Sequence, residues 1–281
     1  MLTLKEMREI AKKISFRWNP SIGQNFLYDH NTLRDIVEFA SKYEATRVIE
    51  VGAGMGNLTE ALTEHFSDIV AIEIDKKLCT YLKEKFSCNQ KVRIICKDIL
   101  KIELQELLKP GSLCVSNIPY YISTPLIMNL LKARTLLKSV ILLTQKEVVE
   151  RLTAKPSTKA YGPLAIYTYL TSTVTKIKNI PPTVFFPKPK VESTLIEVKP
   201  KTSTSFPFEE EPFINFLRSI FIHRRKTIFN NLKALLPEIP TNEIFSLLST
   251  LKISHNSRAE DLKPEIWIEI FKSLLLSNFI L

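Results

Sequence analysis

The residues in this sequence that are best suited to chemistry stand in "NIPYY", residues 117–121, directly after the apolar run "GSLCVS". The side-chain carbonyl of Asn117 and the backbone carbonyl of Ile118 can accept both N–H bonds of an exocyclic adenine amine. These bonds favour a pyramidal nitrogen whose lone pair points at a methyl donor. Pro119 has no N–H and a fixed φ, which holds this backbone in one shape, and Tyr120 offers a ring on which an extruded base stacks. The motif therefore predicts adenine methylation without a metal or a covalent nucleophile.

A glycine-rich turn, "EVGAGMGNLT" at residues 50–59, follows an earlier apolar run. Gly52, Gly54 and Gly56 let the backbone turn tightly and approach a ligand without a Cβ in the way. A dinucleotide fingerprint requires a third glycine where this chain has Asn57. The spacing E-x-G-x-G-x-G instead favours S-adenosylmethionine, which has no pyrophosphate to place on the helix N-terminus. Taken alone, the motif also suits a tight β–α turn that binds nothing.

Two acidic residues end the next two apolar runs, in "AIEID" and "CKDIL". We expect Glu73 to bind the two ribose hydroxyls of the cofactor, as acids do in related sheets. We expect Asp98 to accept from the adenine amine while Ile99 covers the ring, and we assign Ile74, beside Glu73, to the same site. Each acid alone is more often a polar strand end, but in register with the glycines they predict a nucleoside pocket.

These motifs need elements that bring them together, and the first part of the chain alternates between strand and helix patterns. Five strand–helix units follow one another, and their strands are continuous apolar runs. Such runs indicate an α/β fold with a mostly parallel sheet and helices on both faces. Because ligands bind beyond the carboxyl ends of the strands in such sheets, we expect the glycine turn, both acids and "NIPYY" at one edge.

The later part of the chain changes character. Prolines cluster at residues 181–189, and "KPKTSTSFPFEEEP" from Lys199 has the composition of a linker, including a solvated acidic triplet at residues 209–211. After Pro212 the apolar spacing is helical. We therefore expect a catalytic domain over residues 1–200 and a small all-α domain over residues 201–281.

Composition limits the partners and the compartment. The 281 residues are 45% hydrophobic with a formal net charge of +10, which favours nucleic acid first and an acidic membrane second; the plain alternative is a protein kept soluble by its charge. The four cysteines lack C-x-x-C spacing, so we expect buried, reduced thiols and no zinc site. The N-terminus lacks the apolar core of a signal peptide and no apolar run reaches membrane-spanning length, which predicts a cytoplasmic protein.

The sequence resembles the ribosomal RNA adenine N6,N6-dimethyltransferases, and among them the bacterial small-subunit type. The resemblance covers nearly the whole chain and rests on motifs in the same order: "GQNFL", "EVGAGMGNLT", "IEID", "KDIL", "NIPYYISTP", "QKEVVERLTAKP", "FFPKPKVEST", "FIHRRKTIFNNL" and "SRAEDL". It implies a Rossmann-like methyltransferase domain, a small helical RNA-binding domain, and S-adenosylmethionine as cofactor. By the same match Asn25 and Leu27 join the cofactor residues named above.

The activity that the resemblance implies is dimethylation of two adjacent adenines in a hairpin loop near the 3′ end of small-subunit rRNA, with a role in small-subunit biogenesis. The implied partners are this rRNA and the assembling small ribosomal subunit. The resemblance implies no membrane and no metal, and we expect a monomer.

Basic residues beyond the sheet are the candidates for RNA contact. We expect Arg224, Arg225 and Lys226 of "HRRK" to face phosphates, because the neighbouring apolar residues give this segment a buried side. Lys188 and Lys190 add charge on a proline-stiffened loop beside the catalytic one. The plain alternative is the solvated start of a helix.

The chain departs from the family pattern at three places. "RWNPSI", residues 17–22, stands where lysines are usual, and Pro163 stands where a basic residue is common. Both changes remove charge that is expected to face RNA. Tyr121 stands where many relatives have Asn, a change that we expect the fold to tolerate.

Three other functions share some of these features. A large-subunit rRNA adenine methyltransferase has the same catalytic motifs, but "FPKPKVES" and "SRAEDL" favour the small-subunit type. A non-catalytic RNA-binding assembly factor on the same scaffold predicts a damaged glycine turn or "NIPY", and both are intact. A small-molecule N-methyltransferase needs neither the basic surface nor the helical tail.

Overall fold

The structure is a computed structural model that describes residues 1–18, 23–201 and 206–277. The chain folds into two compact units. Unit 1 comprises Met1–Val149 and Ser172–Thr202, and unit 2 comprises Glu150–Thr171 and Ser203–Leu281. Most of "RWNPSI" and part of the expected linker, at residues 19–22 and 202–205, lie outside the described residues.

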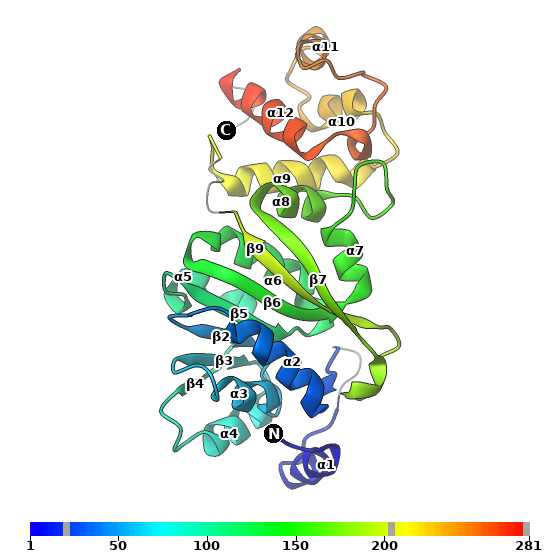
Figure 1. Ribbon diagram of the computed structural model, residues 1–281. Helices are drawn as coiled ribbons and strands as arrows, with labels where there is room; N and C mark the ends of the chain where they lie inside the picture. The colour runs from blue at the N-terminus through cyan, green and yellow to red at the C-terminus, as the bar shows by residue number, and fades with distance from the viewer. Residues whose placement is uncertain (19–22, 202–205, 278–281) are drawn as a thin grey trace. The chain divides into compact units, whose positions relative to one another are not determined.

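Unit 1 is built on a seven-stranded sheet with the strand order β4-β3-β2-β5-β6-β9-β7 (Figure 1). The pairs from β4 across to β6 are parallel, as predicted. β9 pairs antiparallel with both β6 and β7, and a separate two-stranded sheet pairs β1 with β8. The strands are β1 (Phe26–Leu27), β2 (Val48–Val51), β3 (Ile69–Glu73), β4 (Val92–Cys96), β5 (Ser112–Asn117), β6 (Leu137–Gln145), β7 (Ser172–Ile180), β8 (Phe185–Phe186) and β9 (Ser193–Pro200).

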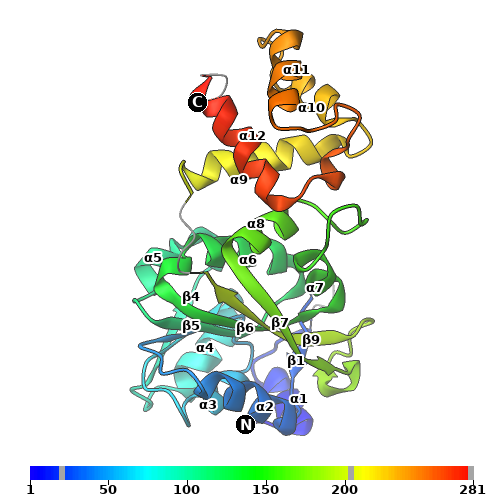
Figure 2. The ribbon, with the colours of Figure 1, turned by 45° about the horizontal axis from the view of Figure 1, so that its top comes forward.

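Helices cover both faces of this sheet, with α2, α3 and α4 on one face and α5 and α6 on the other (Figures 1 and 2). In α2, Leu33, Ile36 and Ala40 recur at helical spacing and are buried against Val48 and Leu113 of the sheet. The helices that begin in this unit are α1 (Leu4–Lys13), α2 (His30–Ser41), α3 (Asn57–Leu62), α4 (Lys76–Lys85), α5 (Leu104–Leu107), α6 (Ser123–Lys132) and α7 (Lys146–Leu152).

The strand register brings the predicted motifs to one edge. Ile49 pairs with Cys114, so counting on along the parallel strands puts Gly52 opposite Asn117. The Ser116 hydroxyl donates to the backbone carbonyl of Val51 at 2.5 Å and ties the two strands together there. The glycine turn and "NIPYY" are therefore neighbours, because the adjacent strands β2 and β5 end at the same level.

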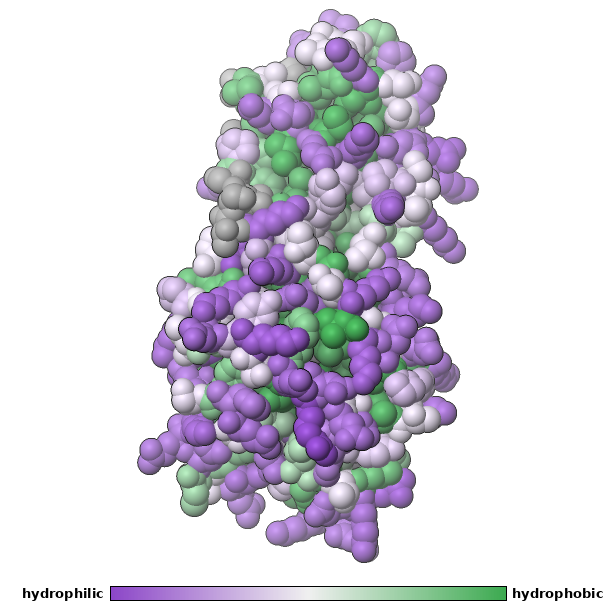
Figure 3. Space-filling view, in the orientation of Figure 1, coloured by the Kyte–Doolittle hydropathy of each residue, from purple (hydrophilic) through white to green (hydrophobic). Residues whose placement is uncertain are grey.

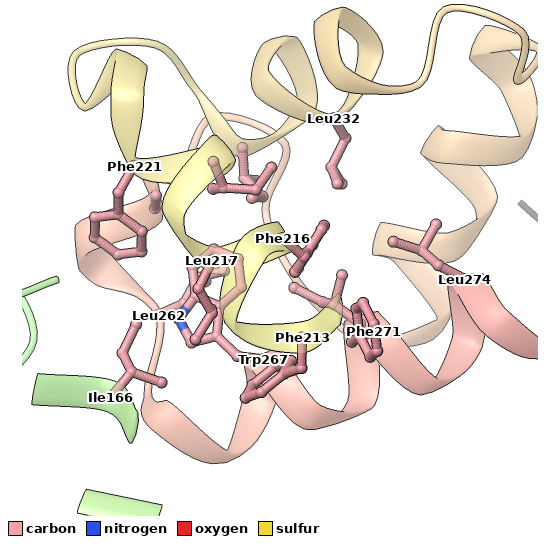
Figure 4. Packing of buried hydrophobic residues seen from close by; sticks show 14 of the residues in the cluster. Ile166, Phe213, Phe216, Leu217, Phe221, Leu232, Leu262, Trp267, Phe271 and Leu274 are labelled. Carbon is pink, nitrogen blue, oxygen red and sulfur yellow. The ribbon is translucent and has the colours of Figure 1, made fainter. Parts of the chain in front are cut away.

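Unit 2 is all helical. Its helices are α8 (Pro163–Thr171), α9 (Glu210–Ile220), α10 (Ile228–Leu235), α11 (Thr241–Thr250) and α12 (Pro264–Leu276). The core is rich in aromatic side chains from α9 and α12, which gather around Phe213, Phe271 and the fully buried Trp267 (Figure 4). The rings of Phe213 and Phe271 meet edge to face with centroids 5.4 Å apart, a preferred arrangement for aromatic pairs.

The segment 150–171 groups with unit 2, whereas the sequence analysis expects it in the first domain. Tyr161 and Ile166 of this segment are buried in the same cluster as Leu217 and Trp267, and the Tyr161 hydroxyl donates to the carbonyl of Leu262 at 2.7 Å. Tyr161, just before α8, thus has a partner 101 residues later in the chain, and Ile166 of α8 packs in a cluster with residues of α9 and α12. A linear boundary does not anticipate such partners.

Two local expectations are wrong. Cys79 and Cys96 form a disulfide rather than two reduced thiols, while Cys88 is free and exposed and Cys114 is free and buried. The acidic triplet 209–211 is not linker but the start of α9. Negative side chains are favourable in the first turn of a helix, where they face the unpaired N–H groups.

The described residues also bear on membranes and metals. Among the helices that the structure describes, none combines the length and the apolar character needed to cross a membrane. Residues 1–18, 23–201 and 206–277 contain no group of three or more His, Cys, Asp or Glu side chains that could hold a metal ion. Hydrophilic side chains predominate on the face of unit 1 that Figure 3 shows.

The placement of α8 predicts a stability effect in unit 2. Ile166→Ala should lower the free energy of unfolding by about 2–5 kcal/mol, because it leaves a cavity among fully buried neighbours. With Trp18 replaced by Phe, the fluorescence of Trp267 reports unit 2 in a urea titration, since the chain has two tryptophans. Ile69→Ala, an equally buried change in β3 of unit 1, is the matched control and should shift this signal less. A smaller shift for Ile166→Ala than for Ile69→Ala would contradict the grouping of α8 with unit 2.

Candidate active site

A pocket of about 750 Å³, including its open mouth, lies at the carboxyl ends of β2, β3 and β5. The structure brings together most of the predicted cofactor and catalytic residues in its lining: Asn25, Leu27, Gly52, Gly54, Glu73, Ile74, Asn117, Ile118 and Tyr120.

Three predicted cofactor residues are not among the described residues that line this pocket. A Cβ on Gly56 would meet side-chain atoms of Leu82 and Phe86 at 2.8 Å, so this glycine serves the packing of α4 on the turn. Asp98 caps the 3₁₀ turn Ile99–Lys101 by accepting from the Leu100 N–H at 3.0 Å. Ile99 is buried in that turn.

The glycine turn can exist only without side chains at two of its positions. Gly52 has φ +75° and Gly54 has φ +59°, a region that L-residues rarely adopt. A Cβ on Gly52 would lie 2.8 Å from the ring of Pro119, and a Cβ on Gly54 would lie 2.8 Å from the ring of Phe26. The turn therefore packs directly against the loop of residues 117–121, the catalytic loop, on one side and against β1 on the other.

Glu73, at the end of β3, is held in a fixed orientation by the backbone. One carboxylate oxygen accepts from the Gly54 N–H at 2.8 Å, and the other accepts from the N–H groups of Ile74 and Asp75 at 2.9 Å. Burial raises the pKa of this carboxyl, and the three backbone hydrogen bonds oppose the rise. The oxygen that faces Gly54 accepts one bond and keeps a lone pair for a ligand hydroxyl.

Asn117 has its amide group oriented by a backbone carbonyl. Its Nδ2 donates to the backbone carbonyl of Asn25 at 3.0 Å, which leaves Oδ1 as the acceptor on the other side of the amide. The next residue is fixed as well, because the Ile118 N–H donates to the carbonyl of Leu143 in β6 at 3.1 Å. Two carbonyl oxygens, one from the Asn117 side chain and one from the Ile118 backbone, are thus presented by rigid elements.

Tyr120 is positioned by contacts from two distant segments. Its hydroxyl lies 3.1 Å from the hydroxyl of Ser193 at the start of β9. A Cβ on Gly23 would lie 3.0 Å from the Tyr120 Cβ and backbone nitrogen, so only glycine allows this close approach. Ser193 and Gly23 position the ring, and the sequence analysis does not anticipate either role, although both lie in motifs that it quotes.

Asn57 has a structural role that the sequence does not reveal, since there it is only the residue that breaks a dinucleotide pattern. Its side chain lines the pocket, donates to the carbonyls of Leu2 and Leu27 at 3.1 and 3.2 Å, and accepts from the Leu2 N–H at 2.7 Å. Met7 of α1 also lines the pocket. Asn57 therefore fastens the N-terminal segment and α1 to the pocket wall, a role with no local sequence signal.

Glu50, the acid of the glycine motif, is a buried carboxyl in the pocket lining. It accepts from the Thr59 hydroxyl at 2.5 Å. Burial raises the pKa of Glu50 to about 8; the bond from Thr59 opposes this rise and the negative charge of Glu73 adds to it. The group is therefore largely protonated in the folded protein at neutral pH.

The expected RNA contacts divide into two kinds. Lys188 and Lys190 in unit 1 and Arg225 and Lys226 in unit 2 are exposed. Arg224 is different, because its guanidinium pairs with Glu260 at 2.7 Å and donates to the carbonyl of Lys159 at 2.7 Å. The expectation that Arg224 is free to face phosphates is therefore wrong, since the side chain holds two segments of unit 2 together.

Known proteins resemble this chain along almost its whole length. Residues 15–275 match the family described as "Ribosomal RNA adenine dimethylase". The chain is 37% identical over 270 residues to "Ribosomal RNA small subunit methyltransferase A" of Alkaliphilus oremlandii, covering 93% of each protein. It is also 37% identical over 276 residues to the protein of that name from a Geobacillus species, covering 95% of each.

Two solved structures share the fold. A dimethyladenosine transferase from Plasmodium falciparum superimposes with a TM-score of 0.76 at 26% identity, covering 90% of this chain and 98% of that one. The 23S rRNA methyltransferase ErmE superimposes with a TM-score of 0.63 at 24% identity, covering 89% and 99%. At that identity the second likeness is one of fold alone.

The raised pKa of Glu50 predicts an unusual dependence of stability on pH. The pKa is about 8 in the folded protein against an ordinary value of 4.5, so folding takes up a proton between these two values. The stabilisation is complete below pH 4.5, and the free energy of unfolding should fall by about 1.4 kcal/mol for each pH unit towards pH 8. Glu50→Gln, which is neutral at every pH, should lose this decline.

Urea titrations from pH 5 to pH 8.5 without added ligand measure the effect. Glu64→Gln changes an exposed acid on the same side of the sheet and should keep the wild-type decline. Parallel pH profiles for Glu50→Gln and the wild type would show that Glu50 is ionised in the folded protein.

Proposed function

The chain belongs to the ribosomal RNA adenine dimethylase family and is an S-adenosylmethionine-dependent rRNA adenine dimethyltransferase, and we propose that it methylates N6 of two adjacent adenosines in a hairpin loop near the 3′ end of small-subunit rRNA. Its partner is then the assembling small ribosomal subunit, and it acts in the cytoplasm as a monomer. The observation that carries the proposal is the Asn117 amide, whose nitrogen is bonded to Asn25 and whose oxygen remains for a substrate amine.

The pocket suits the cofactor. Gly52 and Gly54 bring bare backbone to its wall, and Glu73 keeps a lone pair for a ribose hydroxyl beside them. The exposed part of Ile74, which is 49% accessible, offers an apolar surface at the same end. When bound, S-adenosylmethionine supplies an electrophilic methyl group on a sulfonium. Glu73 and the glycine backbone orient that group by holding the adenosine and the methionine chain.

The catalytic loop then acts on the adenine amine. The amine is a poor nucleophile because its lone pair is delocalised into the ring. In the first of the two methylations, Asn117 Oδ1 and the Ile118 carbonyl accept hydrogen bonds from its two N–H groups and localise the lone pair on a pyramidal nitrogen, while Tyr120 stacks on the extruded base. In the second methylation the amine has one N–H left, which one of these acceptors binds. Positioning and preorganised hydrogen bonds supply the catalysis, and the cost of extruding the base is offset by stacking on Tyr120.

The comparisons bear on the alternatives. Relatives that match over more than nine tenths of both chains carry the small-subunit name, whereas the likeness to the large-subunit enzyme ErmE is one of fold. A non-catalytic assembly factor does not need an oriented Asn117 or a glycine turn that excludes side chains. Small-subunit rRNA is therefore the better supported substrate of the two.

RNA binding rests on exposed positive charge. Lys188 and Lys190 flank Pro189 beside the catalytic loop in unit 1, and Arg225 and Lys226 precede α10 in unit 2. Their ammonium and guanidinium groups can neutralise phosphates and release counterions, which supplies most sequence-independent affinity. Arg224 supports this surface indirectly, by fixing the segment from which Arg225 and Lys226 project.

Asn117→Ala should reduce methyl transfer by about 100- to 1,000-fold, because it removes one preorganised acceptor from the amine. Unmodified small subunits and, in a separate reaction, unmodified large subunits are incubated with radiolabelled S-adenosylmethionine, and the labelled bases are mapped. Asn129→Ala on α6, a partly buried asparagine outside the pocket lining among the described residues, is the control and should retain activity. Near-normal transfer by Asn117→Ala means that the amine is activated differently, and label in large-subunit rRNA means that the substrate assignment is wrong.

Arg225→Ala/Lys226→Ala should weaken RNA binding and flatten its salt dependence. Each lost phosphate contact lowers the slope of log K against log salt by about 0.7–0.9, so the pair should lower it by about 1.4–1.8. The affinity for the rRNA hairpin is measured at several salt concentrations. Lys263→Ala/Lys272→Ala removes the same charge from two other exposed positions of unit 2 and should keep the wild-type slope. Equal slopes for both double variants would place the RNA contacts elsewhere.

A further inference from the structure

Tyr121 is the pocket residue that neither the family pattern nor the mechanism explains. It lies in the 3₁₀ turn Tyr120–Ile122 and lines the pocket, yet half of the side chain is accessible, at 50%. Tyr120, its neighbour, already supplies the ring on which the target base stacks under the proposed function. A large aromatic side chain left half open at a pocket rim is a surface without an assigned occupant.

The two adjacent tyrosines point towards different parts of the sheet. Tyr120 reaches Ser193 at the start of β9, which lies on one side of β5 in the strand order. Tyr121 lies within the electrostatic reach of Glu73 and Asp98, which end β3 and follow β4 on the other side of β5. Burial is the main cause of the raised pKa of Tyr121, and the negative charges of Asp98 and Glu73 add to the rise.

The neighbours of Tyr121 identify the kind of ligand that its ring can meet. Glu73 is the acid assigned to the ribose, and Ile74 presents an accessible apolar side chain in the same lining. The 3₁₀ turn that contains Ile99, which follows Asp98, contacts α6, the helix that starts directly after the turn of Tyr121. Glu73, Ile74 and Tyr121 therefore line one end of the pocket, next to the segment of Asp98 and Ile99, which is not part of the described lining.

We propose that Tyr121 forms the outer wall of the adenosine end of the cofactor pocket and packs its ring on the bound adenosine of S-adenosylmethionine. The inference rests on the proposed function, since it assigns a further residue to the same site. Aromatic rings are large apolar surfaces that pack well against a purine, and an asparagine at this position covers less of it.

A base of the RNA is the competing occupant of this ring. The charges around Tyr121 disfavour it, because a base that stacks here brings its phosphates close to two carboxylates, Glu73 and Asp98. The cofactor carries a positive sulfonium and an uncharged adenosine, so the same carboxylates favour it. The negative charges of Glu73 and Asp98 therefore favour the cofactor over RNA beside Tyr121.

Calorimetry with the full-length protein tests the assignment. Tyr121→Asn should weaken binding of S-adenosylmethionine by about 5- to 30-fold, as expected for losing most of one aromatic contact. S-adenosylhomocysteine and 5′-methylthioadenosine share the adenosine, so their affinities should fall by a similar factor. Tyr121→Phe keeps the ring and should lose less than about 3-fold. Tyr169→Asn changes an equally accessible tyrosine of unit 2 and should bind all three ligands like the wild type.

The outcomes separate this inference from the proposed function. If the wild type binds S-adenosylmethionine and Tyr121→Asn binds it equally well, the inference is wrong while the function stands. If Tyr121→Asn instead loses affinity for the rRNA hairpin alone, the ring stacks on RNA and the assignment to the cofactor fails. If the wild type does not bind S-adenosylmethionine, the proposed function itself fails.

Discussion

The site depends on one steric constraint, the close approach of three backbone segments at the carboxyl edge of the sheet. Gly52 leaves no room for a Cβ beside Pro119, and Gly23 leaves none beside Tyr120. These contacts join the cofactor turn, the segment before β1 and the catalytic loop into one layer. Because each segment touches the next through backbone or a proline ring, the distance between the methyl donor and the amine acceptors is set by packing rather than by flexible side chains.

Hydrogen bonds then give direction to the groups that this layer holds. Asn117 is oriented by the carbonyl of Asn25, and Glu73 is oriented by three backbone N–H groups of which one comes from Gly54. Each functional side chain therefore has a partner in a neighbouring segment of the same layer. A change that loosened the backbone contact at Gly52 or Gly23 would also misalign these bonds, which is why steric fit and hydrogen bonding cannot be separated here.

Sequence reasoning succeeds where the determinant is local. Because a parallel sheet places successive strand ends together, the structure brings Gly52, Gly54, Glu73 and Asn117 into one pocket lining, but Gly56 and Asp98 are not among its described residues. Sequence reasoning does not anticipate β7 and β9, since β7 carries lysines and threonines on an exposed sheet edge and lacks a continuous apolar run. It also misjudges Arg224 and the segment that contains Tyr161, because their hydrogen-bond partners Glu260 and Leu262 are far along the chain. Propensity and spacing carry no information about such partners.

Packing also indicates where this chain can tolerate substitution. A Cβ on Gly52 would lie 2.8 Å from the Pro119 ring, and a Cβ on Gly23 would lie 3.0 Å from the Tyr120 Cβ and backbone nitrogen, so substitution there disturbs the whole layer. Tyr121 sits one residue beyond this contact, with half of its surface open, so the residue type can change while the Asn117 amide and the Tyr120 ring keep their positions. A pocket built in this way can adjust how firmly it holds the adenosine without altering the geometry of methyl transfer. Tolerance of substitution at Tyr121 and intolerance in the contact layer follow from the same packing.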